Sequence, residues 1–276
     1  MTYTINDIEI LISTMNRDSL DFLVPMFPNS HFFNFQILIV NQIQNEKKLT
    51  SSYSNVRVIN SVEKGLSKSR NLALENAIGK ILVIADDDII YKETFITKII
   101  NAYHKFPDAG VIIFSAVNSE GSLIKKYPLN SKNNLNFFDI LNASSIEITL
   151  NKSIIDEARI KFDKIFGLGG IFEIGEEAVF LSDLKKKNKQ LVFEPDVIVK
   201  HEGFTSSDKK SIVEKYYIQG ALFTRIFNRN YIFWIFVKLF FDLKQDKIKF
   251  SSIVNLFKNA KQGHKEFERL QYENNE

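Results

Sequence analysis

Four apolar runs of strand length, residues 9–14, 36–41, 55–59 and 80–85, dominate the first third of the chain. A stretch with helical spacing, 67–77, separates the third run from the fourth. Strands that alternate with helices across short connections form mainly parallel sheets with helices on both faces. The sequence therefore predicts an α/β protein with a Rossmann-like, mixed and mainly parallel sheet.

The second half of the chain continues this pattern less regularly. Helical spacing is present at residues 91–104 and 178–187. Residues 110–117, 146–150 and 190–201 have the apolar content of strands. We therefore expect one sheet to extend to about residue 205.

Polar residues stand at the carboxyl ends of three of these four apolar runs. They are Thr14, Asn41 and the triplet at 86–88. In open α/β sheets, ligands bind beyond the carboxyl ends of the strands. We expect these side chains to converge on one edge of the sheet, although they are far apart in the sequence.

The triplet Asp86, Asp87 and Asp88 carries the strongest chemical signal in the chain. Three neighbouring carboxylates repel one another in a partly desolvated site, and a divalent cation removes that cost. Mg²⁺ or Mn²⁺ prefers such oxygen ligands and shares its shell with substrate phosphates and water. In an extended chain, the first and third aspartates point one way and the second points the other. The alternative is a turn cluster in solvent, which the apolar residues directly after the triplet disfavour.

Other signatures that contain aspartates fit less well. A DDxxD prenyl-diphosphate motif needs an acid where Ile90 stands. A phosphatase of the DxDx(T/V) type places its nucleophile after the first strand, and has Thr or Val at that same position. No G-x-x-x-x-G-K-(S/T) phosphate loop is present in the sequence.

Four separate motifs carry a family resemblance. Residues 10–17, 65–71, 84–88 and 175–180 resemble, in order and spacing, the successive motifs of family 2 glycosyltransferases. The resemblance covers roughly residues 9–205. It implies the GT-A fold and an inverting enzyme that moves a sugar from a nucleotide-diphosphate donor, with a UDP-sugar favoured, to an acceptor hydroxyl.

The resemblance implies a metal-dependent enzyme with a DXD motif. Asp88 would be the principal ligand of Mg²⁺ or Mn²⁺, and Asp86 would assist it or hold the ribose. Asp87 would belong to the nucleotide-sugar site. In some family members a histidine completes the metal site, and His201 occupies that place. A histidine hydrogen-bonded to the backbone is the alternative.

The same resemblance assigns the nucleotide contacts. Thr14, Asn16 and Asn41 stand where the family contacts base and ribose, and Gly65 and Arg70 belong to the motif that meets the nucleotide. The family commonly has an acid near position 41, so the asparagine at this position leaves the identity of the nucleotide base undetermined. A surface helix residue is the alternative for the arginine.

Inversion requires a general base on the acceptor hydroxyl. By resemblance, Glu177 takes the base position and Glu176 supports it, although the family usually has Asp at the base position. Either glutamate could instead cap the helix that follows. Gly169 and Gly170 would let an acceptor approach the backbone, or they form a turn.

The C-terminal segment differs in composition. We place a GT-A catalytic domain at 1–205 and a helical, basic and aromatic extension at 206–276. Residues 206–265 contain 12 Lys and Arg against 4 Asp and Glu. The apolar run 231–241 is too short to span a bilayer and has Lys238 inside it. Aromatic residues interleaved with cations favour contact with an anionic membrane surface. Packing on the catalytic domain or on a second subunit, as in a homo-oligomer, is the alternative.

These features give one leading function. We expect assembly of a bacterial surface polysaccharide or glycolipid, with a saccharide or lipid-linked acceptor and no nucleic-acid partner. We expect the protein in the cytoplasm, peripherally on the inner face of the cell membrane, because the chain lacks cysteine and its N-terminus has no secretory signal pattern. A sugar nucleotidyltransferase and a non-catalytic nucleotide-sugar-binding protein are the alternatives.

Overall fold

The computed structural model describes residues 2–44, 47–201 and 210–273. The chain divides into two compact units. The first, the sheet unit, comprises Met1–Lys164 and Glu176–Gly203. The second, the helical unit, comprises Ile165–Gly175 and Phe204–Glu276. The loop 165–175 therefore belongs to the helical unit although its neighbours on both sides belong to the sheet unit.

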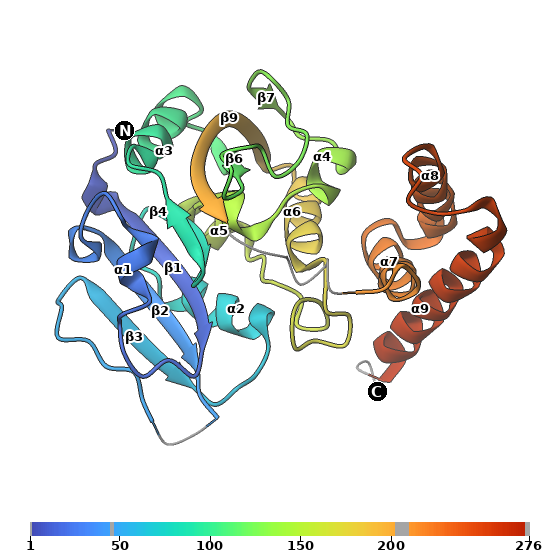
Figure 1. The fold of residues 1–276 in the computed structure, drawn as a ribbon, viewed down its shortest axis with the longest axis horizontal. Helices are drawn as coiled ribbons and strands as arrows, with labels where there is room; N and C mark the ends of the chain where they lie inside the picture. Colours follow the sequence, from blue (N-terminus) through green and yellow to red (C-terminus); the bar gives the residue numbers. More distant parts are fainter. Residues whose placement is uncertain (1, 45–46, 202–209, 274–276) are drawn as a thin grey trace. The chain divides into compact units, whose positions relative to one another are not determined.

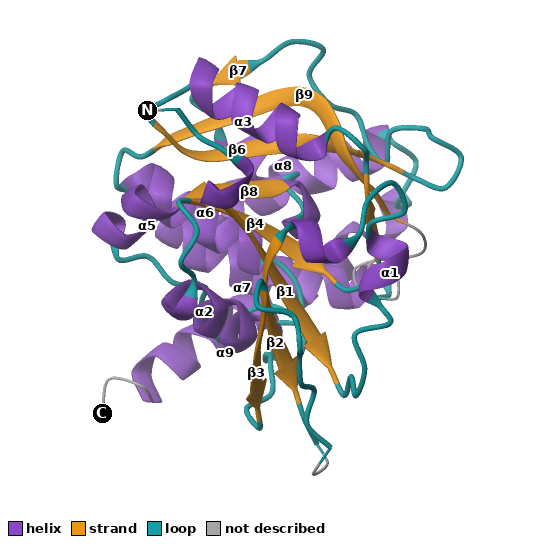
Figure 2. Ribbon diagram, turned by 90° about the vertical axis from the view of Figure 1, so that its left-hand side faces the viewer, coloured by secondary structure: helices purple, strands orange, loops and turns teal. Residues whose placement is uncertain are grey.

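The sheet unit is built on a mixed sheet, which contains nine strands within the described residues. The strands are β1 (Ile8–Met15), β2 (Gln36–Gln42), β3 (Val56–Ser61), β4 (Ile81–Asp86), β5 (Ile89–Tyr91), β6 (Ala109–Val117), β7 (Lys132–Asn133), β8 (Ile148–Asn151) and β9 (Gln190–His201). Their order is β3-β2-β1-β4-β8-β6-β9-β5, and β7 pairs with β9 (Figure 2). The pairs β3–β2, β2–β1, β1–β4 and β6–β9 are parallel. The fold prediction of a mixed, mainly parallel sheet is confirmed.

Helices cover the sheet and connect its strands (Figure 1). The α-helices of this unit are α1 (Leu23–Met26), α2 (Leu66–Asn76), α3 (Phe95–Lys105), α4 (Phe137–Leu141), α5 (Lys152–Ala158) and α6 (Glu176–Lys186). Short 3-10 helices are η1 (Ile5–Asp7), η2 (Phe32–Asn34) and η3 (Ser145–Glu147). The helix expected at 91–104 begins four residues late, because Tyr91 instead ends strand β5, which pairs with β9.

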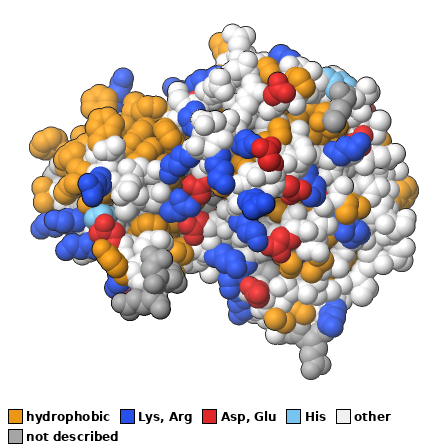
Figure 3. Space-filling model, turned by 180° about the vertical axis from the view of Figure 1, so that it is seen from behind, with side chains coloured by type: hydrophobic (Ala, Val, Ile, Leu, Met, Phe, Trp, Pro, Cys, Tyr) orange, Lys and Arg blue, Asp and Glu red, His pale blue; other side chains and the backbone are white. Residues whose placement is uncertain are grey.

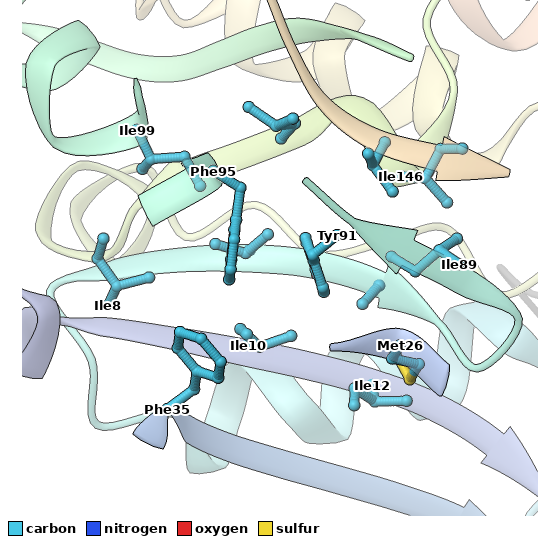
Figure 4. Close-up of a cluster of buried hydrophobic side chains, with 14 of the residues drawn as sticks. Ile8, Ile10, Ile12, Met26, Phe35, Ile89, Tyr91, Phe95, Ile99 and Ile146 are labelled. Atoms are coloured by element: carbon cyan, nitrogen blue, oxygen red, sulfur yellow. The ribbon is translucent and has the colours of Figure 1, made fainter. Parts of the chain in front are cut away.

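One face of the sheet packs on α1 and α3. Alternate residues of β1, namely Ile8, Ile10 and Ile12, are at most 2% exposed and join Met26 and Phe95 in one buried cluster (Figure 4). Side chains two apart on a strand share a face, so this alternation selects the side that these helices cover. Burial of such aliphatic and aromatic side chains is the main force that holds the unit together.

The opposite face carries α2 near its carboxyl edge. Ser13 of β1 hydrogen-bonds Ser69 of α2 through their hydroxyl groups at 3.0 Å. Both residues are buried. This small polar contact lets helix and strand approach closely, and it places the first turn of α2 beside the strand ends.

The helical unit contains α7 (Ile212–Phe227), α8 (Tyr231–Lys244) and α9 (Ile253–Glu273), with the 3-10 helices η4 (Asn228–Asn230) and η5 (Phe250–Ser252). Helices α7 and α9 touch backbone to backbone. A Cβ on Gly220 would lie 1.8 Å from the carbonyl oxygen of Ala260, and a Cβ on Gly263 would lie 1.8 Å from that of Tyr217. Only glycine fits at these two crossing points.

Within residues 2–44, 47–201 and 210–273, no helix combines the length and the apolar content needed to cross a bilayer.

Candidate functional site

The strand ends meet at one edge of the sheet, as expected. In the parallel register, Thr14 of β1 lies opposite Asn41 of β2, and Ser13 lies opposite Asp86 of β4. Asp87 and Asp88 form the turn that follows β4. Because this turn is not extended, the three carboxylates do not alternate simply, and each reaches different partners.

Asp87 ties the turn to the end of β1. Its carboxylate accepts a hydrogen bond from the hydroxyl of Thr14 and another from Nε of Arg17 at 2.9 Å. A second guanidinium nitrogen of the arginine lies 2.7 Å away. The aspartate is thus committed to a charge-assisted pair at the sheet edge. The arginine side chain is 41% exposed, so it remains accessible to an anionic ligand.

Asn41 holds the loop after β1 rather than presenting a free amide. It is fully buried, and its Oδ1 accepts from the backbone N–H of Arg17 at 3.1 Å. Its Nδ2 donates to the carbonyl oxygen of Arg17 at 2.9 Å and to Oδ1 of Asn60 at 3.1 Å. Asn16 has φ 54°, in the left-handed region, and its side chain accepts from the N–H of Gln44. The two asparagines together fix the backbone around the arginine.

Gly65 is the N-cap residue directly before helix α2. It has φ 120°, which an L side chain rarely adopts, and its N–H donates to Oε1 of Gln42 at 2.7 Å. Asn71, further along α2, exchanges two hydrogen bonds of 2.7 and 2.8 Å with the backbone of Phe162. These contacts place the first turns of α2 against the strand ends.

Arg70 lies at the centre of an acidic cluster. Its guanidinium is 2.9 Å from Glu176, 3.4 Å from Glu177 and 3.2 Å from Asp86. The arginine side chain is 2% exposed, and it packs over the ring of Phe162 at 5.6 Å. Besides the predicted nucleotide contact, Arg70 therefore has a structural role, because three carboxylates of the chain itself already engage its guanidinium.

The cluster joins both acidic motifs of the sequence. Asp86 ends β4, whereas Glu176 and Glu177 form the first turn of α6, which also places them where acids stabilise a helix N-terminus. Side-chain exposure falls from 34% for Asp86 to 17% for Glu177 and 6% for Glu176. One cation thus faces three carboxylates in a site that excludes most water.

The excess of carboxylates over cations in this buried cluster controls its protonation. Burial raises the pKa of Glu176, and the neighbouring charge of Glu177 raises it further, although Arg70 opposes both. Burial also raises the pKa of Asp86, again against the arginine. Burial alone would lower the pKa of Arg70, but the three carboxylates more than reverse this. Glu176, the most buried of the acids, is the natural place for a proton.

Asp88 has a different partner, at the end of β9. Its carboxylate lies 3.5 Å from Nε2 of His201, and the residue that follows it, Ile89, pairs with His201 in the sheet. The hydrogen bond with this imidazole lowers the pKa of Asp88. The aspartate side chain is 58% exposed and the histidine 12%, so the pair opens to solvent on the carboxylate side.

The donor set of this pair suits a divalent cation in part. A carboxylate oxygen and an imidazole nitrogen are both ligands of Mn²⁺-like ions, and the remaining positions would go to phosphate and water. Asp86 is held by Arg70 and by the hydroxyl of Ser145 at 3.2 Å. Over the part of the chain that the structure covers, no three His, Asp or Glu side chains form a ready-made metal cage.

Gly169 and Gly170 lie in the loop 165–175 of the helical unit. The first has φ 79°, and a Cβ on the second would lie 2.8 Å from the carbonyl oxygen of Ile165. Both are therefore required by the turn itself. Phe172 of this loop packs on Tyr217 of α7, with ring centroids 5.7 Å apart.

Two site residues were not among the predicted contacts. Arg17 follows Asn16 directly. A cation just beyond a strand end, at the edge that carries three aspartates, is a sequence pattern that could have indicated this contact. Ser145 begins η3 and reaches Asp86 across 59 residues of sequence. No local pattern marks it.

Solved structures share this fold. Residues 1–349 of S. aureus TarS match with a TM-score of 0.53 at 14% identity, over 80% of this chain and 65% of that one. The same protein in complex with UDP-GlcNAc matches with a TM-score of 0.55 at 15% identity, over 80% and 66%. The chain thus spans about two thirds of the length of these neighbours. At this identity the likeness establishes the GT-A fold.

The sequence establishes the family. The sequence profile described as "Glycosyl transferase family 2" matches residues 4–158, which is more than half of the chain. The protein therefore belongs to glycosyltransferase family 2, as the four motifs predicted. No curated protein sequence matches the chain closely enough to narrow this further.

Proposed function

We propose that the protein is an inverting glycosyltransferase that moves a sugar from a nucleotide-diphosphate donor to an acceptor hydroxyl. The observation that carries this is the Arg70 cluster, which joins the aspartates at the end of β4 to the glutamates of α6. The aspartates are the proposed groups for binding the donor, and the glutamates are the proposed groups for deprotonating the acceptor. A UDP-sugar is the donor we favour, since a structural neighbour of the same fold is described in complex with UDP-GlcNAc.

Glu177 is the proposed base. It is 17% exposed, against 6% for Glu176, so it is the more accessible of the two carboxylates. In the reaction it takes the proton of the acceptor hydroxyl, whose oxygen forms a bond to the anomeric carbon while the bond to the donor phosphate breaks. Attack from the side opposite the leaving diphosphate inverts the anomeric centre. Glu176 and Arg70 orient the base without touching the reacting atoms.

Thr14, Asn16, Asn41, Gly65 and Asp87 form the proposed nucleotide side of the site. Thr14 bonds Asp87, whereas the two asparagines and the glycine bond neighbouring residues of the strand ends and of the loop after β1. These contacts fix the backbone of the site, as preorganised binding requires. Asn41 is fully buried, so its part is to hold this loop.

Asp88 and His201, with Asp86 nearby, are the proposed ligands of Mg²⁺ or Mn²⁺. Such an ion would neutralise charge on the leaving diphosphate. Asp88 is the firmest of the three, because its carboxylate is the most exposed and lies beside the imidazole of His201.

We place the acceptor among saccharides or lipid-linked saccharides of a bacterial surface polysaccharide or glycolipid. The loop with Gly169 and Gly170 is the proposed acceptor contact, because it leads directly into Glu176 in the sequence. This role fits a protein at the inner face of the cell membrane.

Calorimetry of UDP binding, with and without Mn²⁺, tests the donor site. Asp88→Asn should abolish the gain from Mn²⁺, and Asp108→Asn, at an exposed loop carboxylate, should leave it unchanged. Binding that ignores both the metal and the Asp88 substitution would overturn the metal proposal. A screen of common sugar nucleotides for donor hydrolysis identifies the sugar. Glu177→Gln should lower transfer by about 10²–10⁴-fold while UDP still binds.

A further inference from the structure

Helix α8 is apolar on two sides. Its inner side, Tyr231, Ile235 and Leu239, is buried within the helical unit. Its outer side carries Phe233 and Phe240, which are 63% and 61% exposed. A helix that packs on one face of a protein ordinarily has a polar outer face. The outer phenylalanines of α8 therefore require an explanation other than the packing of the unit.

The exposed phenylalanines belong to a larger patch, which we term the aromatic face. It comprises Phe233, Phe236, Phe240 and Phe241 of α8, Phe250 of η5 and Val254 of α9, each 41–81% exposed. The rings of Phe236 and Phe257 stack at 5.4 Å, which joins α8 to α9. Figure 3 shows hydrophobic side chains gathered over the helical unit, with Lys and Arg at their margin. Contiguous exposed apolar surface of this kind marks an interaction site.

Charge around the aromatic face is mainly positive. Residues 229–258 contain six Lys or Arg and two Asp, with no Glu. Lys238 and Asp242 pair with each other, which leaves five cations against one carboxylate (6 − 1 and 2 − 1). The five are Arg229, Lys244, Lys247, Lys249 and Lys258, all exposed.

We propose that the aromatic face docks on an anionic lipid bilayer, with its phenylalanines in the boundary between headgroups and acyl chains and its lysines on the lipid phosphates. This inference deepens the membrane part of the proposed function and does not depend on the reaction. Phenylalanines favour the apolar side of that boundary, and lysines at its rim gain from the negative surface potential. A helix of 14 residues is about 21 Å long, so α8 lies in the interface and does not cross it.

A second copy of the chain is the competing occupant. In a two-fold dimer each face meets its own equivalent, so five cations would face five cations. Repulsion between like charges disfavours such a contact. An anionic surface, in contrast, attracts the same cations. The charge of the face therefore favours lipid over self-association.

Co-sedimentation with vesicles tests the proposal. The full chain is expected to bind phosphatidylcholine vesicles that contain phosphatidylglycerol and to bind pure phosphatidylcholine far more weakly. The double variant F240S/F250S should lose most of the binding. The triple variant K244E/K247E/K249E should lose about a hundredfold in affinity for the anionic vesicles. F138S, at a phenylalanine 52% exposed in the sheet unit, is the matched control and should bind as the unaltered chain does.

Trp234 provides a second readout. It is the only tryptophan of the chain and stands beside Phe233 in α8. Insertion of the aromatic face should shift its emission to shorter wavelength with anionic vesicles, and high salt should weaken the shift. Light scattering of the lipid-free chain tests the competing occupant. A dimer that F240S/F250S dissociates, together with no vesicle binding, would overturn the proposal.

Three controls keep the outcomes separate. Circular dichroism should show that the variants remain folded, because the altered side chains are exposed. Donor hydrolysis without lipid should be unchanged in all of them. Vesicle binding that is equal in the unaltered chain and in both variants overturns the inference, even if glycosyl transfer is demonstrated. Loss of activity with intact vesicle binding would count against the proposed reaction alone.

Discussion

The guanidinium of Arg70 lies 2.9 Å from the carboxylate of Glu176, across 106 residues of sequence. This contact joins helix α2 to helix α6 beneath the acidic edge of the sheet. Both side chains are almost fully buried, at 2% and 6% exposed. A buried pair of this kind contributes specificity of arrangement more than net stability, because desolvation offsets much of the attraction.

Removal of the cation should therefore be costly. Arg70→Met leaves three carboxylates in a poorly solvated site, and we expect the free energy of unfolding to fall by about 3–5 kcal/mol. Urea denaturation measures this. The double variant R70M/E177Q should recover part of the loss, because it removes one of the carboxylates that the arginine no longer neutralises. Equal destabilisation of the single and double variants would show that the two groups do not interact.

Glu176 should make stability depend on pH. Burial and Glu177 raise its pKa in the folded state from 4.5 to about 8. The folded protein then holds a proton that the unfolded chain releases, so the contribution is present below pH 4.5 and is lost as pH rises through 8. The slope for one proton is at most about 1.4 kcal/mol per pH unit. Glu176→Gln should flatten this fall, and Glu93→Gln, at an exposed position, should not. Urea denaturation from pH 5 to 9 decides between them.

Asn41 should not tolerate an acid. Its Nδ2 donates to the carbonyl of Arg17 and to Oδ1 of Asn60. Asn41→Asp replaces this donor by an acceptor that faces two other oxygens, so we expect a loss of about 1–3 kcal/mol or more. Asn41→Ala should cost about the same, and Asn101→Ala, on an exposed face of α3, almost nothing. Thermal unfolding provides the measurement. UDP affinity of Asn41→Ala should also fall, since the loop that carries Arg17 loosens.

Gly220 and Gly263 should reverse the usual effect of a glycine-to-alanine change. In an exposed helix, alanine stabilises by about 1 kcal/mol relative to glycine. Here the added Cβ would lie 1.8 Å from a carbonyl oxygen of the facing helix, so α7 and α9 must separate. Gly220→Ala and Gly263→Ala should lower the thermal midpoint, whereas Lys261→Ala, exposed on α9, should not. An unchanged midpoint in both glycine variants would mean that the helices do not cross so closely.

Sequence alone determined the sheet and its chemistry-bearing edge. The apolar runs at 9–14, 36–41 and 80–85 became β1, β2 and β4, because strands buried on both faces are apolar throughout and stand out from their flanks. Parallel strands end at the same edge, so the convergence of Thr14, Asn41 and Asp86 followed from their positions alone. The family motifs, which are local in sequence, were also recognisable without the structure.

Only the tertiary structure decided what each polar side chain contacts. Nothing local to Arg70 indicates that it is buried among Asp86, Glu176 and Glu177, since those contacts span up to 107 residues. Ser145 has no local signal, and the loop 165–175 belongs to the helical unit because Phe172 packs there. Hydrogen bonds and ion pairs require the two groups to be positioned to within a few tenths of an ångström, and the packing of the whole chain sets these positions. Periodicity in the sequence reports which face of an element is buried, and it carries no information about which distant group that face meets.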